Sequence, residues 1–366
     1  MKWSVKAADS HIRNNPEMPI VWHHIHGVLY KALESLWEET GDPKYFDYVR
    51  RNIDVLIDEN GKIKDYPLTE LKLDNINCGK VLFTLYKETH DERYRKALFF
   101  LKEHLRIQPT TKQGLYWHKG YMPYQSVLDG TYMYIPFLAE FEKTFNAPGY
   151  FDKLIDQVMT IASDTYDEKT GLYYQGYDDT REIFWADDVT GHSQCFWGRT
   201  IGWFAMTMVD LLDFIPTSHP RRFEVVRLFA DLMKAIVNVQ DPESGVWYQV
   251  LDQGTREGNY LEASASGMFI YALAKGIRKG YLDREVFVDP MLKAYRGELE
   301  EFVDDNDGNI VVKHVCINVD LGATPADDSS YEFYINGPVG DDDLKGISTF
   351  LLASLEVEKL GYDHVN

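Results

Sequence analysis

Three features are scarce in this sequence of 366 residues: cysteine, long apolar runs and positive charge. The three cysteines, Cys78, Cys195 and Cys316, are far apart and odd in number, so we expect neither a disulfide framework nor a metal site, and we predict reduced thiols in the cytoplasm. No apolar run approaches the roughly 18–20 residues that span a bilayer, and the first nine residues hold no apolar stretch of signal-peptide length. Membrane insertion and export by a signal peptide are therefore not expected.

The shortage of positive charge restricts the partners. Lys and Arg number 38 against 58 Asp and Glu, which leaves a formal charge of -20. Nucleic acid is excluded as an expected partner, because binding its backbone needs a basic surface. A small anionic ligand would need only a local cationic spot. Apolar residues make up 45% of the chain, which is enough for a large core and excludes a disordered or fibrous protein.

Two short phrases recur along the chain. The first separates stretches with apolar residues at helical spacing and predicts the turn of an antiparallel helix pair. It occurs at 39–45 (ETGDPKY), 88–94 (ETHDERY) and, more loosely, 143–150 (KTFNAPGY). The second begins with glycine and predicts an aromatic strand within a longer loop. It occurs at 114–118 (GLYWH), 171–175 (GLYYQ) and 245–249 (GVWYQ), with weaker echoes from Gly61 and Gly308.

Twelve helices are expected, with short and long connections in alternation. They are predicted at 3–14, 23–39, 43–58, 74–89, 91–106, 129–145, 149–165, 193–214, 219–239, 262–280, 283–303 and 343–360. This order favours an all-α fold, an (α/α)6 barrel of six helical hairpins with the long loops at one end and the first helix paired with the last. An open solenoid is the alternative. No shift in composition marks a boundary, so residues 1–366 are expected to form a single domain.

In such a barrel the helices that follow the long loops start at the same end. Asp74, Asp129 and Ser193 lie near three of these starts, where an N-cap role is the ordinary interpretation. The approach to Asp129 is uncharged and partly apolar, which indicates a buried carboxyl that could face Asp74 across one mouth. A helix N-terminus favours ionisation, whereas burial and a second carboxylate favour a proton on one partner. If the latter effects win, the pair has the acid arrangement of paired-carboxylate glycosidases.

Other polar groups are predicted near the same mouth. The fourth residue after the glycine is His118, Gln175 or Gln249 in the three strand phrases, and it lies either in the mouth or on a surface turn. Arg199 lies between two tryptophans and needs an anion, either an internal carboxylate or one on a ligand. His24 belongs to a histidine cluster that lacks the further ligands of a metal site. No phosphate-binding loop or dinucleotide fingerprint occurs, so no cofactor is expected.

Three long motifs, in this order, resemble those of glycoside hydrolase family 105, the unsaturated rhamnogalacturonyl hydrolases and their relatives. They are residues 124–133 (YQSVLDGTYM), 195–203 (CFWGRTIGW) and 260–269 (YLEASASGMF). The resemblance covers nearly the whole chain. It implies an (α/α)6 barrel that removes a terminal 4,5-unsaturated uronic acid from a lyase product by hydration of the enol ether. The expected partner is therefore an unsaturated oligosaccharide.

The resemblance also implies roles for single residues. Asp129 would be the acid and base, and Asp74 its carboxylate partner. The ligand contacts that it implies are His118, Trp197, Arg199, Trp203 and His24. One departure concerns Gln175, the first residue of QGYD at 175–178, because the family commonly reads His-Gly-Trp-Asp there. This exchange of a histidine for a neutral amide bears on which uronide or leaving sugar is preferred.

Two other functions are compatible with the same sequence. A sugar epimerase or isomerase on this barrel would use histidines as acid and base, and only His118 and His24 qualify. A carbohydrate-binding protein with a decayed catalytic centre would fit the exchange at Gln175. The sequence does not determine the uronic acid, the linkage, the leaving sugar or the oligomeric state.

Overall fold

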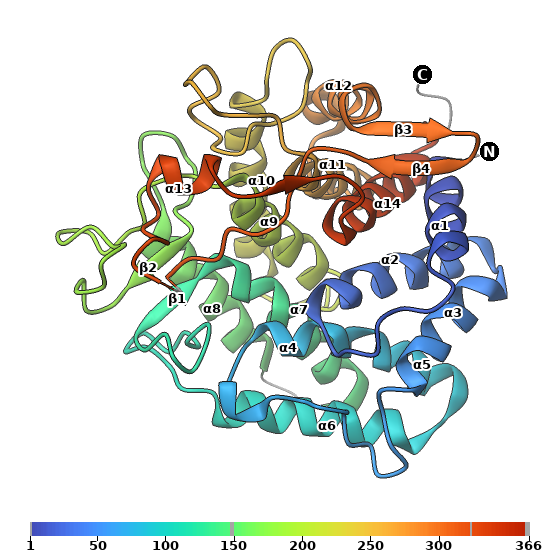
Figure 1. Ribbon diagram of the computed structural model, residues 1–366. Helices are drawn as coiled ribbons and strands as arrows, with labels where there is room; N and C mark the ends of the chain where they lie inside the picture. The colour runs from blue at the N-terminus through green and yellow to red at the C-terminus, as the bar shows by residue number, and fades with distance from the viewer. Residues whose placement is uncertain (1, 147–149, 323, 363–366) are drawn as a thin grey trace.

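Six segments form a closed inner ring in a computed structural model that describes residues 2–146, 150–322 and 324–362 (Figure 1). Each segment contacts the next around the ring, and the last contacts the first. In ring order they are α2 (His24–Thr40), α4 (Asp74–Asn77) continued by α5 (Val81–Thr89), α7 (Leu128–Phe145), α9 (Gly198–Leu211), α11 (Ala263–Arg278) and α14 (Leu344–Lys359). All six follow a long connection, so their N-termini meet at one end.

An outer helix packs against each inner one, which completes six hairpins. The outer helices are α3 (Pro43–Asp54), α6 (Glu92–Ile107), α8 (Tyr150–Thr165), α10 (Arg222–Asn238), α12 (Arg284–Phe302) and α1 (Trp3–Asn14). The first helix closes the barrel against the last. The Ser4 backbone N–H donates to Glu358 Oε1 at 2.9 Å, and the Trp3 and Phe350 rings meet edge-on at 6.1 Å. Figure 1 shows α1 (blue) beside α14 (red). The predicted all-α barrel is confirmed.

The recurring turn phrase has the same geometry at its first two copies. Gly41 and His90 end their helices in the left-handed conformation, with φ of 69° and 55°. The carboxylates of Asp42 and Asp91 then accept the Lys44 and Arg93 backbone N–H groups at 3.1 and 2.9 Å, which caps the next helix. The third copy includes residues 147–149, which lie outside the described residues, as does the predicted helix start at 149.

Several predicted helix boundaries differ from the structure. The helix predicted at 74–89 is interrupted by a 3-10 turn, η2 (Cys78–Lys80), where Gly27 of α2 lets the two backbones approach closely. The helix predicted at 193–214 begins only at Gly198, because the backbone at Trp197 pairs with Val250. Two short helices were not predicted, α13 (Tyr331–Ile335) and the 3-10 helix η1 (Leu68–Glu70). Among the described residues, no helix is long and apolar enough to cross a bilayer.

The glycine-started strands are shorter than predicted. All five glycines, from Gly61 to Gly308, have positive φ, so the glycine is the turn residue. Most of these phrases form single β-bridges, and only the last is part of a ladder, between β3 (Val303–Asn306) and β4 (Asn309–Val312). The other two-stranded sheets pair β1 (Gln125–Val127) with β2 (Gly176–Asp178) and β5 (Val315–Cys316) with β6 (Val339–Gly340).

Candidate active site

A cavity of about 310 Å³ lies at the end of the barrel where the inner helices begin. The first two residues of five inner helices contribute polar side chains to its wall: His24, Asp74, Asp129, Arg199 and Lys345. Because each side chain occupies the same place on its helix, the ring itself brings together residues that are far apart in the sequence. The two predicted carboxylates therefore line one cavity.

The environments of the two carboxylates push their pKa values in opposite directions. Burial raises the pKa of Asp129 above its usual range, against the opposing influences of the Thr200 hydrogen bond and of His118. Burial also disfavours ionisation of Asp74, but the electrostatic influence of His118, His24 and Lys119 outweighs it and lowers the pKa of Asp74 to about 2. One carboxyl thus favours a proton while the other stays ionised, which is the division between acid and partner that glycosidases use.

Neither aspartate is an N-cap, so that interpretation is wrong here. Asp74 is the first residue of α4 and Asp129 the second of α7, and no side-chain cap precedes either helix. Ser193 accepts the Gly176 N–H at 3.2 Å, five residues before α9 begins. Asp129 Oδ2 instead accepts a hydrogen bond from the Thr200 hydroxyl on α9. This hydrogen bond ties the carboxyl of Asp129 to the neighbouring inner helix.

His118 connects the two aspartates. Its Nε2 lies 3.7 Å from Asp74 Oδ1, and its Nδ1 faces the helix position next to Asp129. That position is Gly130, where an added Cβ would lie 2.8 Å from His118 Nδ1 and 3.0 Å from Leu73 Cδ1. The glycine after the aspartate therefore makes room for the imidazole.

Arg199 has an internal anion. Its Nη2 lies 3.5 Å from Glu262 Oε1 and also donates to the Cys316 carbonyl, while the Trp197 ring lies 5.2 Å from the guanidinium carbon. Glu262 is fully buried and caps α11 by accepting the Ala265 N–H at 2.7 Å. The Glu262 carboxylate lies outside the cavity lining, whereas Arg199 lines the cavity. The guanidinium group is therefore held by a partner that does not face the cavity.

An aromatic stack closes the floor of the cavity. Trp203 lines the cavity and stacks on Tyr132, with ring centres 4.8 Å apart and planes 23° from parallel. Tyr132 lines a second cavity of about 710 Å³ at the opposite end of the barrel, and Lys80 Nζ lies 3.5 Å from the ring centre of Tyr132 on that side. Among the described residues, none lines both cavities. The stack separates the two ends of the barrel.

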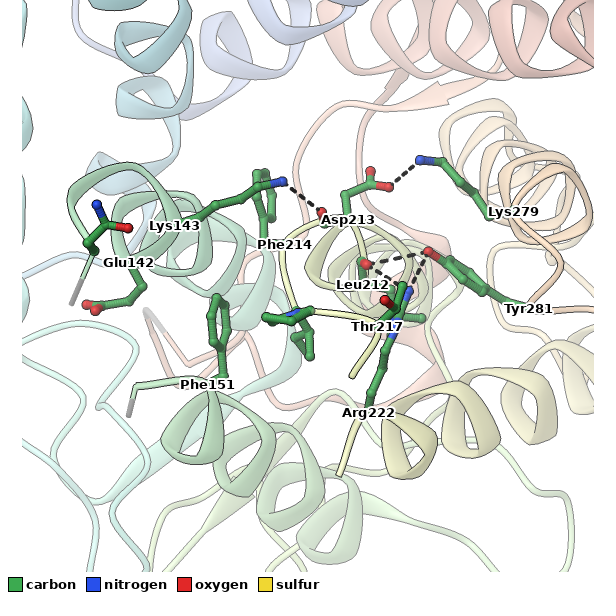
Figure 2. A pocket seen from close by; sticks show the side chains of 13 residues that line it. Glu142, Lys143, Phe151, Leu212, Asp213, Phe214, Thr217, Arg222, Lys279 and Tyr281 are labelled. Carbon is green, nitrogen blue, oxygen red and sulfur yellow. Dashed lines mark hydrogen bonds and ion pairs between the residues drawn. The ribbon is translucent and has the colours of Figure 1, made fainter. Parts of the chain in front are cut away.

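A third cavity, of about 730 Å³, lies at the C-terminal ends of α7 and α9 (Figure 2). Several of its polar groups pair with one another: Lys279 Nζ lies 2.7 Å from Asp213 Oδ1, and Arg222 Nη2 donates to the Tyr281 hydroxyl at 2.9 Å and to the Leu212 carbonyl at 3.0 Å. None of the predicted site residues lines this cavity. The two predicted carboxylates line the smaller cavity at the other end, which is therefore the candidate active site.

The family model described as Glycosyl Hydrolase Family 88 matches residues 2–361. The chain belongs to this family. It is therefore a glycoside hydrolase, as predicted. A solved family 105 glycoside hydrolase of C. acetobutylicum ATCC 824 is 39% identical, with a TM-score of 0.95 over 98% of this chain and 100% of that one, which confirms the resemblance stated from the motifs.

Two further relatives of this family 88 chain have names that state an activity. The unsaturated rhamnogalacturonyl hydrolase YesR of Bacillus subtilis is 26% identical over 272 residues, or 72% of this chain and 74% of YesR. The unsaturated glucuronyl hydrolase of Bacillus sp. GL1 is 13% identical, with a TM-score of 0.71 over 97% of this chain and 95% of that one, so it shares the fold. The family match confirms the predicted class of enzyme, a glycoside hydrolase.

The departure at Gln175 has a structural account in this family 88 chain. Gln175 does not line the cavity, contrary to the expected place in the mouth, because its Oε1 accepts the Tyr334 hydroxyl at 2.6 Å. Gln249, at the equivalent place, accepts the Trp197 indole N–H at 3.0 Å and is also buried. Of the three equivalent residues only His118 reaches the cavity. The side-chain amides of Gln175 and Gln249 lie outside the cavity lining and instead accept hydrogen bonds from Tyr334 and Trp197.

Some cavity residues were not predicted. Lys345, Asn318 and Asp320 line it together with the expected residues. Asp320 Oδ2 lies 2.5 Å from Nζ of Lys119, the residue after His118. The sequence signal for Lys345 is limited to its place just after an acidic run at 340–343 (GDDD). In the described part of the chain, no group of three or more His, Cys, Asp and Glu side chains is placed to hold a metal ion.

Replacing Thr200 with Val should move the alkaline limb of kcat to higher pH. The hydroxyl hydrogen bond stabilises ionised Asp129, so its loss raises the pKa of Asp129 further and keeps the acid protonated to higher pH. The plateau should change by less than about tenfold, because one such bond contributes about 0.5–1.5 kcal/mol. The matched control is Thr207→Val on the same helix, whose hydroxyl donates to the Trp203 carbonyl. A limb that stays in place, or moves to lower pH, contradicts the assignment of Asp129 as the acid.

A buried acid behind the site should make stability depend on pH. Glu298 is fully buried, neither carboxyl oxygen has a hydrogen-bond partner among the described residues, and burial with Glu262 nearby raises the pKa of Glu298 well above its usual range. Folded Glu298 thus retains a proton that the unfolded chain loses above about pH 4.5. The free energy of unfolding therefore falls as pH rises from about 4.5 toward the raised pKa of folded Glu298. Glu298→Gln should raise Tm by a few degrees at pH 8 and much less at pH 4.5. Equal shifts at both pH values would show that Glu298 does not titrate in this way.

Proposed function

We propose that this family 88 hydrolase removes a 4,5-unsaturated uronic acid from the end of an oligosaccharide by hydrating its C4=C5 enol ether. The observation that carries the proposal is the pair of carboxylates in one cavity with opposite protonation preferences, Asp129 as the acid and Asp74 as the ionised partner. The names of the relatives support the same class of substrate.

The reaction requires a proton to be given and then taken back. Asp129 transfers its proton to C4, and positive charge develops at C5 beside the ring oxygen. Water adds at C5 and returns a proton to the Asp129 carboxylate, which leaves a hemiketal. The hemiketal ring opens to a ketone at C5. Ring opening leaves C1 as a hemiacetal carbon, which becomes an aldehyde and releases the leaving sugar as an alcohol. Asp74 stays ionised throughout, while burial favours the protonated form of Asp129.

The remaining residues are proposed to bind the sugar. Trp203 and Trp197 offer apolar ring faces in the cavity, and His118, His24 and Arg199 offer donors. Burial lowers the pKa of His24 to about 4, so near neutral pH it acts as an uncharged donor or acceptor. Gln175 belongs to this set indirectly, through Tyr334.

The proposal treats residues 1–366 as one catalytic domain that works in the cytoplasm without a cofactor. The pairing of the first helix with the last supports one domain, since neither half of the chain could close the barrel alone. The three cysteines are free and buried, which suits a reducing compartment.

The test follows the ultraviolet absorbance of the unsaturated uronide. The enzyme is incubated with lyase-made disaccharides that differ in uronic acid, linkage and leaving sugar. Loss of absorbance together with release of the leaving sugar is expected for at least one of them. Sugar interconversion without loss of absorbance would indicate an epimerase or isomerase, and tight binding without turnover would indicate a binding protein.

A further inference from the structure

Two cations of the cavity lining have partner carboxylates that lie outside the lining. Arg199 and Lys345 both line the cavity, whereas the carboxylates that pair with them, Glu262 and Asp343, do not. Lys345 Nζ lies 2.8 Å from Asp343 Oδ1, and the same oxygen accepts the Lys345 backbone N–H at 2.9 Å as the cap of α14. In both pairs the cation lines the cavity, and the carboxylate that pairs with it lies outside the lining.

The two cations are close enough to influence each other. Burial lowers the pKa of Lys345, and the positive charge of Arg199 lowers it further, against the opposing influence of Asp343. An anion placed between the two cations would relieve this repulsion. The N-termini of α9 and α14, which carry these residues, add partial positive charge at the same place. In a chain with a formal charge of -20, this is a local cationic spot inside the proposed active site.

We propose that Lys345 and Arg199 together bind the carboxylate of the unsaturated uronic acid, and that Lys345 determines the preference for an acidic over a neutral terminal sugar. The inference rests on the proposed function and identifies how its substrate is recognised. The inference is carried by the placement of Lys345 and Arg199 in the cavity lining while the carboxylates paired with them lie outside it. Arg199 is the poorer residue to test, because its loss leaves the buried Glu262 without a cationic partner and threatens folding.

The experiment compares two substrates in several variants. The substrates are an unsaturated uronide that the wild type hydrolyses and the C6 methyl ester of the same disaccharide, which has no charge. Lys345→Gln should raise KM for the acid about tenfold, with kcat changed less than about threefold, and should leave KM for the ester nearly unchanged. Lys345→Arg should restore the preference for the acid. The matched control is Lys359→Gln, a lysine at the other end of α14 that lines the opposite cavity and should behave like wild type.

Three results would overturn the inference while leaving the proposed function intact. An unchanged ratio of acid to ester activity in Lys345→Gln would show that Lys345 does not recognise the carboxylate. Equal losses of activity on the acid and the ester in Lys345→Gln, if Lys345→Arg does not restore them, would show that Lys345 has a purely structural role. An effect confined to substrates with a sulfated leaving sugar would place the recognised anion there instead. If no unsaturated uronide loses absorbance with the wild type, the proposed function fails first, and this inference fails with it.

Discussion

An Asp129→Asn variant should fold like the wild type and lose about 10³-fold in kcat. The expected loss is that of a general acid, which contributes roughly 10²–10⁴-fold. Asn keeps the shape of the side chain and can still accept the Thr200 hydroxyl bond, but it cannot transfer a proton to C4. Loss of ultraviolet absorbance under saturating substrate measures kcat, and Tm checks the fold. KM should change little, because the variant still binds the sugar.

The control for this variant is a matched exchange at a helix start far from the cavity. Asp42 caps α3 by accepting the Lys44 N–H at 3.1 Å and is partly exposed. Asn caps helices as well as Asp, so Asp42→Asn should keep both Tm and kcat. If Asp129→Asn retains more than a tenth of the wild-type kcat, another group supplies the proton and the proposed role of Asp129 is wrong.

Replacing Gly27 with Ala should damage both stability and activity. An added Cβ would lie 2.6 Å from Cys78 Cα, 2.8 Å from Cys78 N and 3.0 Å from Asn77 C, all of which are backbone atoms that no rotamer change can move. The α2 helix would have to separate from α4, and overpacking of this kind costs about 2–3 kcal/mol. Because these helices carry His24 and Asp74, kcat/KM of the folded enzyme should fall as well. Denaturant unfolding and the absorbance assay measure the two effects.

Gly276 provides the comparison. It lies near the other end of the barrel in α11, and an added Cβ would meet the side-chain atoms Leu282 Cδ1 and Phe229 Cε1, each at 2.8 Å. Side chains can shift where a backbone cannot, so Gly276→Ala should cost less stability and leave kcat/KM unchanged. Equal losses in the two variants would mean that the close approach at Gly27 does not position the site.

The barrel could be predicted because each hairpin carries its own local signal. The turn phrases at 39–45 and 88–94 place a left-handed residue and a capping aspartate at fixed positions, which is chemistry that the sequence records directly. The two aspartates were predicted to share a mouth because every inner helix starts at the same end. The break at Cys78 could not be predicted, since it arises where Gly27, 51 residues earlier in the chain, packs against that backbone.

The residues of the cavity wall were predicted less completely, because a single segment of the sequence does not show which of its side chains reach the cavity. Gln175 and His118 follow their glycines at the same distance, yet one faces a tyrosine hydroxyl and the other the cavity. Lys345 is one lysine after an acidic run, and nothing in its neighbours indicates that the barrel closes there. The electrostatic competition at Asp129 and Asp74 also needed the structure, since His118 and His24 reach Asp74 from other hairpins.

The stack of Trp203 on Tyr132 lies between the cavity of the proposed active site and the cavity at the opposite end of the barrel. If the stack blocks passage between the two ends, a polymer cannot thread through the barrel, and we expect only the terminal sugar of a chain to reach Asp129. The cleaved unit lies innermost and has to leave by the route through which it came, after the shortened chain has moved out of the way. The geometry therefore implies that each encounter removes one terminal residue, and that long chains are trimmed by repeated binding and release.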